Sequence, residues 1–254
     1  MLTRRNGWLV GLIFILVLST SATARTYTSY YTCLPGSVTA VVLTNASTYD
    51  HEEAFQLTMY SADGTVLYAF VGNLDSYQST VYFLNDFIDE PNEFSWGPLV
   101  IESNVLLLAG VWIGTEDEWV SISNVQSQVL STDGLDVAYF WYGANYANTE
   151  HRRTGIAVVN PGKSAITGTA YIYDSDGSLQ DSSDFTLSSH GAAYFTPESV
   201  FPIGEDSWGL IDIRSTNPIV VVSEYYDARG ILLDVDIIDT VYYLQIRQSN
   251  SGDS

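Results

Sequence analysis

The chain has 254 residues, with 9 basic and 30 acidic side chains and a formal net charge of −21. Nucleic acids and anionic membrane surfaces would be repelled by this charge, so neither is expected as a partner. A hydrophobic content of 46% excludes a disordered acidic protein, and the single cysteine, Cys33, excludes an internal disulfide. A hydrophobic core must therefore hold the fold together.

The N-terminus has the three parts of a secretory signal peptide. Arg4 and Arg5 precede a short apolar run, Trp8–Leu18, and the small residues Ala22-Thr23-Ala24 follow it. A bilayer-spanning helix needs about 20 apolar residues, so no transmembrane segment is predicted. We expect residues 1–24 to be cleaved and the mature protein to be exported, to the periplasm or the extracellular space.

Short runs typical of β-strands follow one another along the rest of the chain. The first half has them at 26–32, 38–43, 55–60, 66–70, 80–84, 96–101, 105–112 and 119–130. In the second half, a run at 137–142 precedes a predicted loop at 143–153, and further runs include 231–238 and 241–246. No window has a useful helical periodicity, so the sequence predicts an all-β protein.

Three landmarks occur twice, in the same order and at nearly constant spacing, which indicates a tandem duplication. We predict two tandem antiparallel β-sandwich (immunoglobulin-like) units at residues 25–133 and 134–247, followed by a flexible tail at 248–254. The tryptophans of the repeat are expected to be buried in equivalent places. The matched pairs are Asp63-Gly64 with Asp176-Gly177, Tyr82-Phe83 with Tyr194-Phe195, and Trp96-Gly97 with Trp208-Gly209.

The repeat also predicts local connections. Each Asp-Gly pair lies between alternating runs and predicts a hairpin turn. A second hairpin is predicted between the runs at 96–101 and 105–112. Two continuous apolar runs, Val105–Leu108 and Ile219–Val222, require cover on both faces of their strands, which favours packing between the repeats or self-association.

Two segments of the second unit carry a family resemblance, Asn160-Pro161-Gly162 and Ser215–Val221. The unit resembles a tandem β-sandwich repeat of uncharacterised exported bacterial proteins and is distantly similar to the small sandwich of sensory rhodopsin transducers. The first unit departs from the pattern, because Leu43-Thr44-Asn45 lacks the Pro-Gly and Asn104-Val105 lacks the proline. The resemblance implies a non-enzymatic binding or assembly domain and transfers no site residues.

An acidic cluster in the second unit is a candidate calcium site, because calcium takes several oxygen ligands. Its spacing does not fit an EF-hand, since Ser178 occupies the third ligand position and no glutamate closes the loop. A hairpin turn with solvated acids explains the same residues, and no cofactor is otherwise expected. The cluster consists of Asp174, Asp176, Asp181 and Asp184.

Enzyme chemistry has little support in the sequence. His51, His151 and His190 have no histidine at metal-ligand spacing, and no G-x-S-x-G motif occurs. Aromatic residues are the other candidates, because exposed rings stack on sugars or anchor protein partners. Packing within the sheets explains them equally well at this stage. The candidate recognition aromatics are Tyr139, Trp141, Tyr142 and Tyr146.

The sequence therefore predicts a non-catalytic exported binding or assembly module, acting on a protein partner or on a second copy of itself. A glycan-binding module, with or without calcium, is the alternative, and a hydrolase is the third. An exposed row of aromatics across one sheet favours the glycan, and a flat apolar patch favours protein association.

Overall fold

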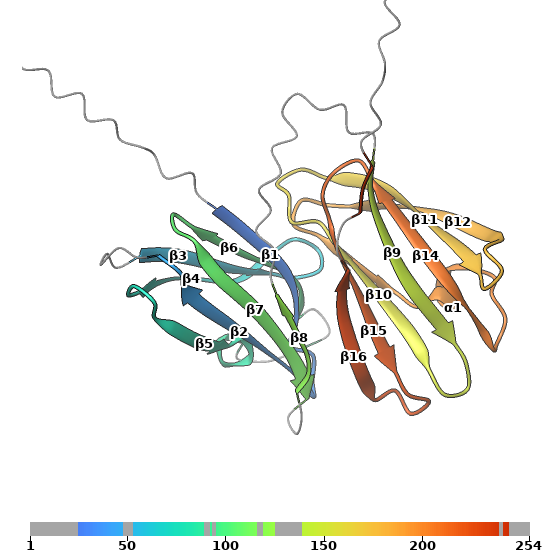
Figure 1. Cartoon of the computed structure of the whole chain (residues 1–254), viewed down its shortest axis with the longest axis horizontal. Coiled ribbons are helices and arrows are strands. Elements are labelled where there is room, and N and C mark those ends of the chain that lie inside the picture. Colours follow the sequence, from blue (N-terminus) through green and yellow to red (C-terminus); the bar gives the residue numbers. More distant parts are fainter. Residues whose placement is uncertain are drawn as a thin grey trace, which may run out of the picture.

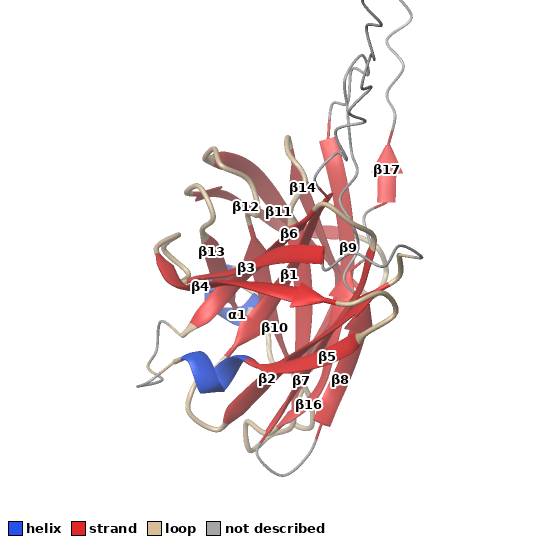
Figure 2. Ribbon diagram, turned by 90° about the vertical axis from the view of Figure 1, so that its left-hand side faces the viewer, coloured by secondary structure: helices blue, strands red, loops and turns tan. Residues whose placement is uncertain are grey.

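The computed structural model describes residues 25–47, 53–88, 92, 95–115, 119–124, 139–238 and 241–243. The signal peptide, His51, the boundary at residue 133 and the tail lie outside these residues. The prediction of an all-β protein is confirmed, because nearly all of the described secondary structure is strand (Figure 2). In the described part of the chain, no helix is long and apolar enough to cross a bilayer.

The first half of the chain, unit 1, forms a sandwich of two four-stranded antiparallel sheets. One sheet, the A sheet, has the order β1-β6-β3-β4, and the other, the B sheet, has the order β5-β2-β7-β8. The elements are β1 (Arg25–Thr32), β2 (Ser37–Asn45), β3 (Glu53–Tyr60), β4 (Val66–Leu74), β5 (Ser79–Phe83), a 3-10 turn η1 (Leu84–Phe87), β6 (Trp96–Ser103), β7 (Leu107–Thr115) and β8 (Trp119–Asn124).

The second half, unit 2, has the same strand order. Its A sheet is β9-β14-β11-β12 and its B sheet is β13-β10-β15-β16, and the two meet where Arg153 of β10 pairs with Asn148 of β9. The elements are β9 (Tyr139–Asn148), β10 (Arg153–Val159), β11 (Ile166–Asp174), β12 (Leu179–Leu187), β13 (Ala192–Phe195), a one-turn helix α1 (Pro197–Val200), β14 (Ser207–Ser215), β15 (Val220–Tyr226), β16 (Leu232–Ile238) and β17 (Val241–Tyr243), which pairs with β9.

Equivalent side chains make equivalent hydrogen bonds in the two units. Asn45 at the end of β2 donates to the carbonyl of Leu74 at 3.1 Å, and Asn160 after β10 donates to that of Ser188 at 2.6 Å. The hydroxyl of Tyr27 accepts the backbone N–H of Leu107, the first residue of β7, at 2.8 Å. In the same way, the hydroxyl of Tyr142 accepts the N–H of Ile219, the residue before β15, at 2.8 Å. These pairs fix the correspondence between the units residue by residue.

The correspondence corrects one landmark of the repeat. Val42 pairs with Val81, and its equivalent Ala157 pairs with Tyr194. Tyr194 therefore corresponds to Val81, and Tyr82 corresponds to Phe195, one residue away from the match read in the sequence. Because successive side chains of a strand point to opposite faces, an error of one residue in the match reverses which side chains point outward.

Two other predictions about the strands are wrong. Strands β6 and β7 belong to different sheets and do not form a hairpin, and their equivalents β14 and β15 do not pair with each other either. The predicted loop at 143–153 is mostly strand, since β9 runs to Asn148. Within the chain, the first continuous apolar run is buried on one face only, because Leu107 is buried whereas Leu108 is 61% exposed.

Each sandwich has its own core, and the two units also share one. In β10 and β15, Ile156, Val158 and Val221 point into the core of unit 2. The alternate residues belong to the buried cluster of unit 1, so both faces of these strands are covered. This explains the continuous apolar run at Ile219–Val222. The residues of unit 2 that join the cluster of unit 1 are Ala157, Val159, Val220, Val222 and Val235.

The units thus pack face to face, with unit 1 on the left and unit 2 on the right of Figure 1. We use the term A face for the outer side of an A sheet and B face for the outer side of a B sheet. The A face of unit 1 lies against the B face of unit 2, where Trp96 meets Tyr194 and Tyr60 stacks on His190. One backbone hydrogen bond, from the N–H of Ala192 to the carbonyl of Ala62, also joins the units.

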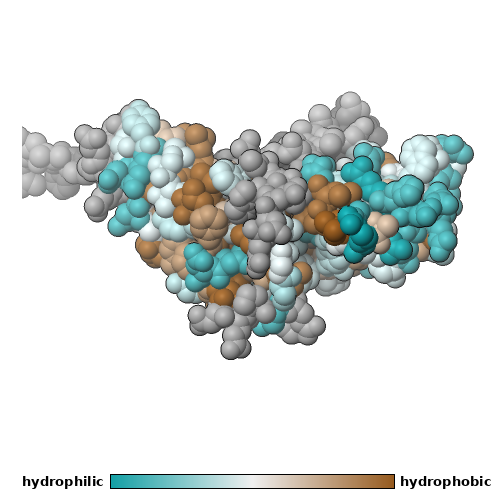
Figure 3. All heavy atoms as spheres, turned by 90° about the horizontal axis from the view of Figure 1, so that it is seen from below, coloured by the Kyte–Doolittle hydropathy of each residue, from teal (hydrophilic) through white to brown (hydrophobic). Residues whose placement is uncertain are grey.

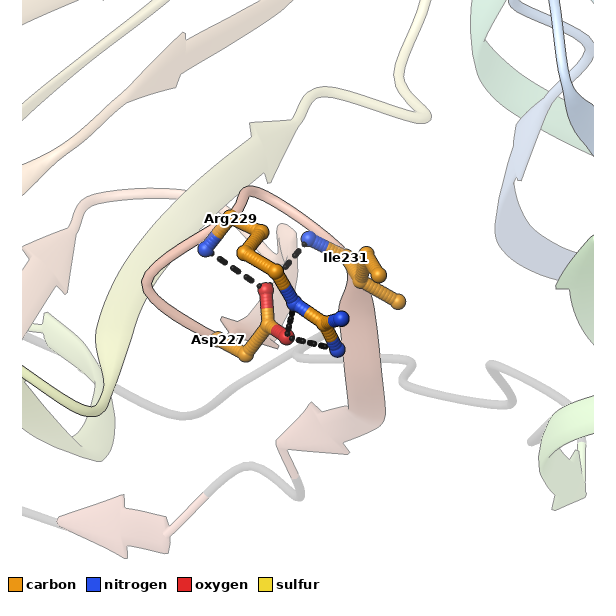
Figure 4. A network of polar contacts seen from close by, with 3 residues as sticks. All are labelled: Asp227, Arg229 and Ile231. Atoms are coloured by element: carbon orange, nitrogen blue, oxygen red, sulfur yellow. Dashed lines mark hydrogen bonds and ion pairs between the residues drawn. The ribbon is translucent and has the colours of Figure 1, made fainter.

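The turn after β15 shows how the acidic residues organise loops (Figure 4). The carboxylate of Asp227 accepts the backbone N–H groups of Arg229 and Ile231 at 2.8 and 2.9 Å and pairs with the Arg229 guanidinium at 2.9 Å. These hydrogen bonds lower the pKa of Asp227, the bond from Ile231 most of all. The acid here serves the turn geometry.

Candidate functional site

The contact between the units contains a buried acid. Glu224 on β15 is 3% exposed and accepts a hydrogen bond from the hydroxyl of Tyr30 in unit 1 at 3.0 Å. The hydroxyl of Tyr226 also donates to Glu224, and the hydroxyls of Tyr194 and Tyr226 are 3.4 Å apart. Burial raises the pKa of Glu224, while the hydrogen bonds from the tyrosines oppose this rise. The same burial raises the pKa of Tyr194 to about 12.

Glycines make room for this contact. A Cβ on Gly155 would lie 1.8 Å from the hydroxyl of Tyr194, so only glycine lets that ring lie over β10. A Cβ on Gly64 would lie 2.2 Å from the carbonyl oxygen of Ser189 in unit 2, whereas the equivalent Gly177 has open space. The interface is therefore closely packed, and the polar cluster around Glu224 belongs to it.

Among the described residues, the packing of one A face on one B face leaves two faces, one on each unit, with no other sheet packed on them. The first is the B face of unit 1, formed by the outward side chains of β2, β5 and β7. Leu108, Phe83 and Val81 are 61%, 44% and 43% exposed. Hydrophobic residues reach the surface over unit 1 in the view from below (Figure 3, left). None of the outward residues in the paired parts of these three strands can ionise. They are Ala40, Val42, Thr44, Ser79, Val81, Phe83, Leu108, Gly110 and Trp112.

The second uncovered face is the A face of unit 2, which carries an aromatic surface around one ion pair. Trp208 is 60% exposed, and Trp141 and Tyr173 are half-buried beside it. A hollow of about 690 Å³ lies between these rings. A second hollow of about 530 Å³ adjoins it across Arg214. This arrangement suits a ligand that offers flat apolar surface together with polar groups.

The ion pair at the centre of this face is strongly held. Asp212 is 1% exposed and accepts the Nε and Nη2 hydrogens of Arg214 at 2.9 and 2.7 Å. The guanidinium lies 4.5 Å from the ring centre of Tyr171 and 5.4 Å from that of Trp141. Burial raises the pKa of Asp212 and Arg214 opposes the rise. The pair neutralises itself, so the face has little net charge at its centre.

The predicted recognition aromatics divide between surface and core. Trp141 lies on the A face of unit 2, but Tyr142 and Tyr146 are 1% and 3% exposed and point inward. The backbone of Tyr139 begins β9, and its side chain lies outside the described atoms. Sequence reasoning missed Tyr171, Tyr173 and the outward residues of β14. The period-two pattern in β14 could have identified them, because Trp208, Leu210, Asp212 and Arg214 alternate with inward residues.

The tryptophan landmarks lie at equivalent positions but differ in burial. Trp96 pairs with Thr32 and Trp208 with Ala147, at matching ends of β6 and β14. Trp96 is partly covered by Tyr194 of unit 2, whereas Trp208 is exposed. The expectation of a buried Trp208 is therefore wrong, because none of the described elements packs over it as unit 2 packs over Trp96.

The four aspartates of the candidate calcium site do not gather around one point. Asp174 accepts the backbone N–H groups of Asp176 and Ser178 at 3.0 and 2.9 Å, which holds the hairpin turn. Asp184 accepts the hydroxyl of Thr169 at 2.8 Å, and Asp181 precedes it by an odd number of residues, on the opposite side of β12. Among the described residues, no three acidic, histidine or cysteine side chains come together as metal ligands.

Cysteine and histidine side chains contribute to the packing. Cys33 is buried and its thiol donates to the Asn85 side chain at 3.4 Å, and burial raises its pKa to about 12. The ring of His190 stacks on Tyr60 with centres 4.1 Å apart, and burial lowers its pKa. His151 is exposed in the turn between β9 and β10. None of these residues lies on an uncovered face described above.

No protein-family model matches the chain, and no curated protein is similar to it in sequence. Two solved β-glucuronidase structures from Bacteroides uniformis match 88% of this chain and 27% of their own, at 15% and 13% identity and a TM-score of 0.17. A glycosyl hydrolase family 2 member from Bacteroides cellulosilyticus matches 86% of this chain and 28% of its own, at 9% identity and a TM-score of 0.17. The chain thus spans about a quarter of the length of these proteins. At TM-scores this low, the similarity supports no inference about fold or activity.

Proposed function

We propose that this protein is a non-catalytic, exported binding module that associates with protein through the B face of unit 1. One observation carries the proposal. The described outward residues of β2, β5 and β7 include no ionisable side chain and are mostly apolar, on a chain with a net charge of −21 whose exposed surface would ordinarily carry acids. The equivalent B face of unit 2 already packs against protein, which supports the same use in unit 1.

The test is cross-linking in cells with the tagged full-length chain, comparing Leu108→Lys with Val71→Lys. Both side chains are largely exposed, at 61% and 68%, but Val71 lies on β4, away from the B face. We expect Leu108→Lys to lose the cross-linked partner, because a lysine at the centre of an apolar contact must be desolvated. Val71→Lys should retain the partner. Equal capture by both variants would contradict the proposal.

Glycan binding on the A face of unit 2 is the second candidate. It is favoured by the exposed Trp208 beside Trp141 and Tyr173, with the Asp212–Arg214 pair available for hydroxyl groups. The test is retention on immobilised polysaccharides, comparing Trp208→Ala with Phe83→Ala, which removes an exposed ring from the other face. Loss of retention in Trp208→Ala alone would support the glycan, and retention of neither the wild type nor the variants would contradict it.

A further inference from the structure

The contact within the chain defines a pairing rule for these sandwiches. One A face packs on one B face, and each unit has both faces because the units share their strand order. The contact uses the A face of unit 1 and the B face of unit 2, and β8 at the edge of the B sheet of unit 1 also lies beside β16. In the part of the chain that the structure describes, the A face of unit 2 and the B face of unit 1 have no such counterpart.

We propose that these two faces bind each other between copies of the chain, so that molecules associate head to tail. The inference rests on the proposed function, because it names a second copy of this chain as the protein that the B face of unit 1 binds. The partner surface on that second copy is the aromatic A face of unit 2. Each joint between molecules then pairs the same two kinds of face as the joint within the molecule, without the polar cluster around Glu224.

The two B faces match at two central positions, although Val81 and Trp112 of unit 1 take the places of Tyr194 and Glu224. Register with the neighbouring strands makes Val42 equivalent to Ala157 and Leu108 equivalent to Val220. Ala157 and Val220 are buried against unit 1, whereas Leu108 is exposed. The B face of unit 1 is thus apolar like the B face of unit 2, which packs on the other unit, but no described sheet packs on the B face of unit 1.

The two A faces also match at two aromatic positions that make contact, whereas Asn145 takes the place of Tyr30. Trp96 and Tyr60 of unit 1 contact Tyr194 and His190 of unit 2. The equivalent positions in unit 2 are Trp208 and Tyr173, which keep the aromatic character. Val100, buried at the centre of the first A face, is replaced by Asp212.

The replacement of Val100 is compatible with docking because Arg214 neutralises Asp212 within the same face. The A face of unit 2 therefore offers exposed rings around a paired charge, and the B face of unit 1 offers an apolar surface with no charge of its own. Docking the two leaves no unpaired charge at the centre of the joint, and the carboxylates of Asp174 and Asp184, which line the two hollows, must stay solvated at its rim.

The geometry of this contact has a consequence for assembly. The two surfaces differ, so the contact is heterologous and generates an open chain, or a ring if the rotation closes. Each sandwich would then contact only its neighbours, as in repeat proteins. Because every copy carries a charge of −21, copies repel one another, and added salt should strengthen association by screening this repulsion.

The experiment uses two full-length variants, each defective in one face. Leu108→Lys damages the B face of unit 1, and Trp208→Lys damages the A face of unit 2. Both side chains are about equally exposed, at 61% and 60%, so neither substitution disturbs a core. Val81→Lys, on the same B face, provides an independent variant, and Val71→Lys is the control. Melting curves confirm that each variant folds, and sedimentation velocity gives the masses.

We expect the wild type and Val71→Lys to form species larger than dimers as concentration rises in high salt. Each face variant alone should remain monomeric, with association weakened about tenfold or more. An equal mixture of Leu108→Lys and Trp208→Lys should form one-to-one dimers and nothing larger, because one intact face of each kind remains. Val81→Lys should behave as Leu108→Lys does.

Two results would overturn the inference. Dimers of Trp208→Lys alone would show that B faces bind each other, and a monomeric wild type at every concentration and salt would show that copies do not associate. The wild type could be monomeric and yet capture another protein in cells, with Leu108→Lys losing that protein. In that case the head-to-tail assembly is wrong and the proposed function holds. If neither association nor capture depends on Leu108, both are wrong.

Discussion

At the scale of single residues, the contact between the units depends on a buried carboxylate that is held by tyrosines. Glu224 receives hydrogen bonds from Tyr30 of the other unit and from Tyr226 on its own strand. None of the basic side chains described by the structure forms an ion pair with it. The burial of an acid without a cation is costly, so its hydrogen bonds matter for stability.

Replacement of Tyr30 by phenylalanine tests this contact. The variant keeps the ring but leaves Glu224 without one of its donors, so we expect the free energy of unfolding to fall by about 2 kcal/mol. Tyr77→Phe is the matched control, because Tyr77 is 64% exposed and should change stability little. Chemical denaturation measures both, and equal stability of the two variants would show that the hydroxyl of Tyr30 does not support the interface.

Replacement of Glu224 by glutamine tests the electrostatics. Burial raises the pKa of Glu224 above its ordinary value of 4.5. Below that pH the acid is protonated in both folded and unfolded states, and as pH rises further the unfolded state ionises first, which destabilises the fold. Glutamine does not ionise. We therefore expect the stability of Glu224→Gln relative to the wild type to increase as pH rises from 4.5 towards neutral.

Denaturation midpoints of the wild type and Glu224→Gln, measured from acid to neutral pH, check this expectation. A difference that is constant with pH would show that Glu224 titrates as it does in the unfolded chain. If the stability of Glu224→Gln relative to the wild type instead decreases as pH rises, the hydrogen bonds lower the pKa of Glu224 more than burial raises it.

At the scale of elements, the two Asp-Gly hairpins have the same backbone but different surroundings. Gly64 and Gly177 have φ angles of 91° and 81°, which side-chain-bearing residues rarely adopt. The turn at Gly64 lies against Ser189 of unit 2, whereas the turn at Gly177 is open. The same substitution at both turns therefore separates the cost of the interface from the cost of the turn.

We expect Gly177→Ala to lower stability by about 1–2 kcal/mol, the cost of a left-handed backbone with a Cβ. Gly64→Ala should cost about 1–3 kcal/mol more, because its Cβ would overlap the Ser189 carbonyl. Thermal unfolding of the two variants measures the difference. Equal melting temperatures would contradict the close contact between this turn and unit 2.

Local features of the fold were predictable from sequence, and non-local pairing was not. Alternation placed most strands, and the Asp-Gly pairs identified the hairpins β3–β4 and β11–β12. Sheet membership of β6 and β7 was not predictable, because a short connection serves equally for a hairpin or for a crossing between sheets. The period-two pattern of β14 could have shown which of its side chains point outward, but the cover of Trp96 and the exposure of Trp208 depend on the neighbouring unit.

At the scale of the whole molecule, two sandwiches of the same topology join through unlike faces, the A face of unit 1 and the B face of unit 2. Among the described residues, no sheet packs on the other two faces, the B face of unit 1 and the A face of unit 2. The B face of unit 1 has no ionisable side chain among its described outward residues from β2, β5 and β7, and the A face of unit 2 has aromatic rings around a neutralised pair. Both surfaces have the character of contacts, although Asp174 and Asp184 line the hollows on the second of them.

The most direct measurement is sedimentation velocity of the wild-type protein over a range of concentrations at low and high salt. We predict that the mean mass rises with concentration beyond that of a dimer and that the rise is steeper at high salt, where repulsion between acidic copies is screened. A single monomeric species under every condition would contradict head-to-tail association, and association that weakens as salt is added would contradict an apolar contact between the two uncovered faces.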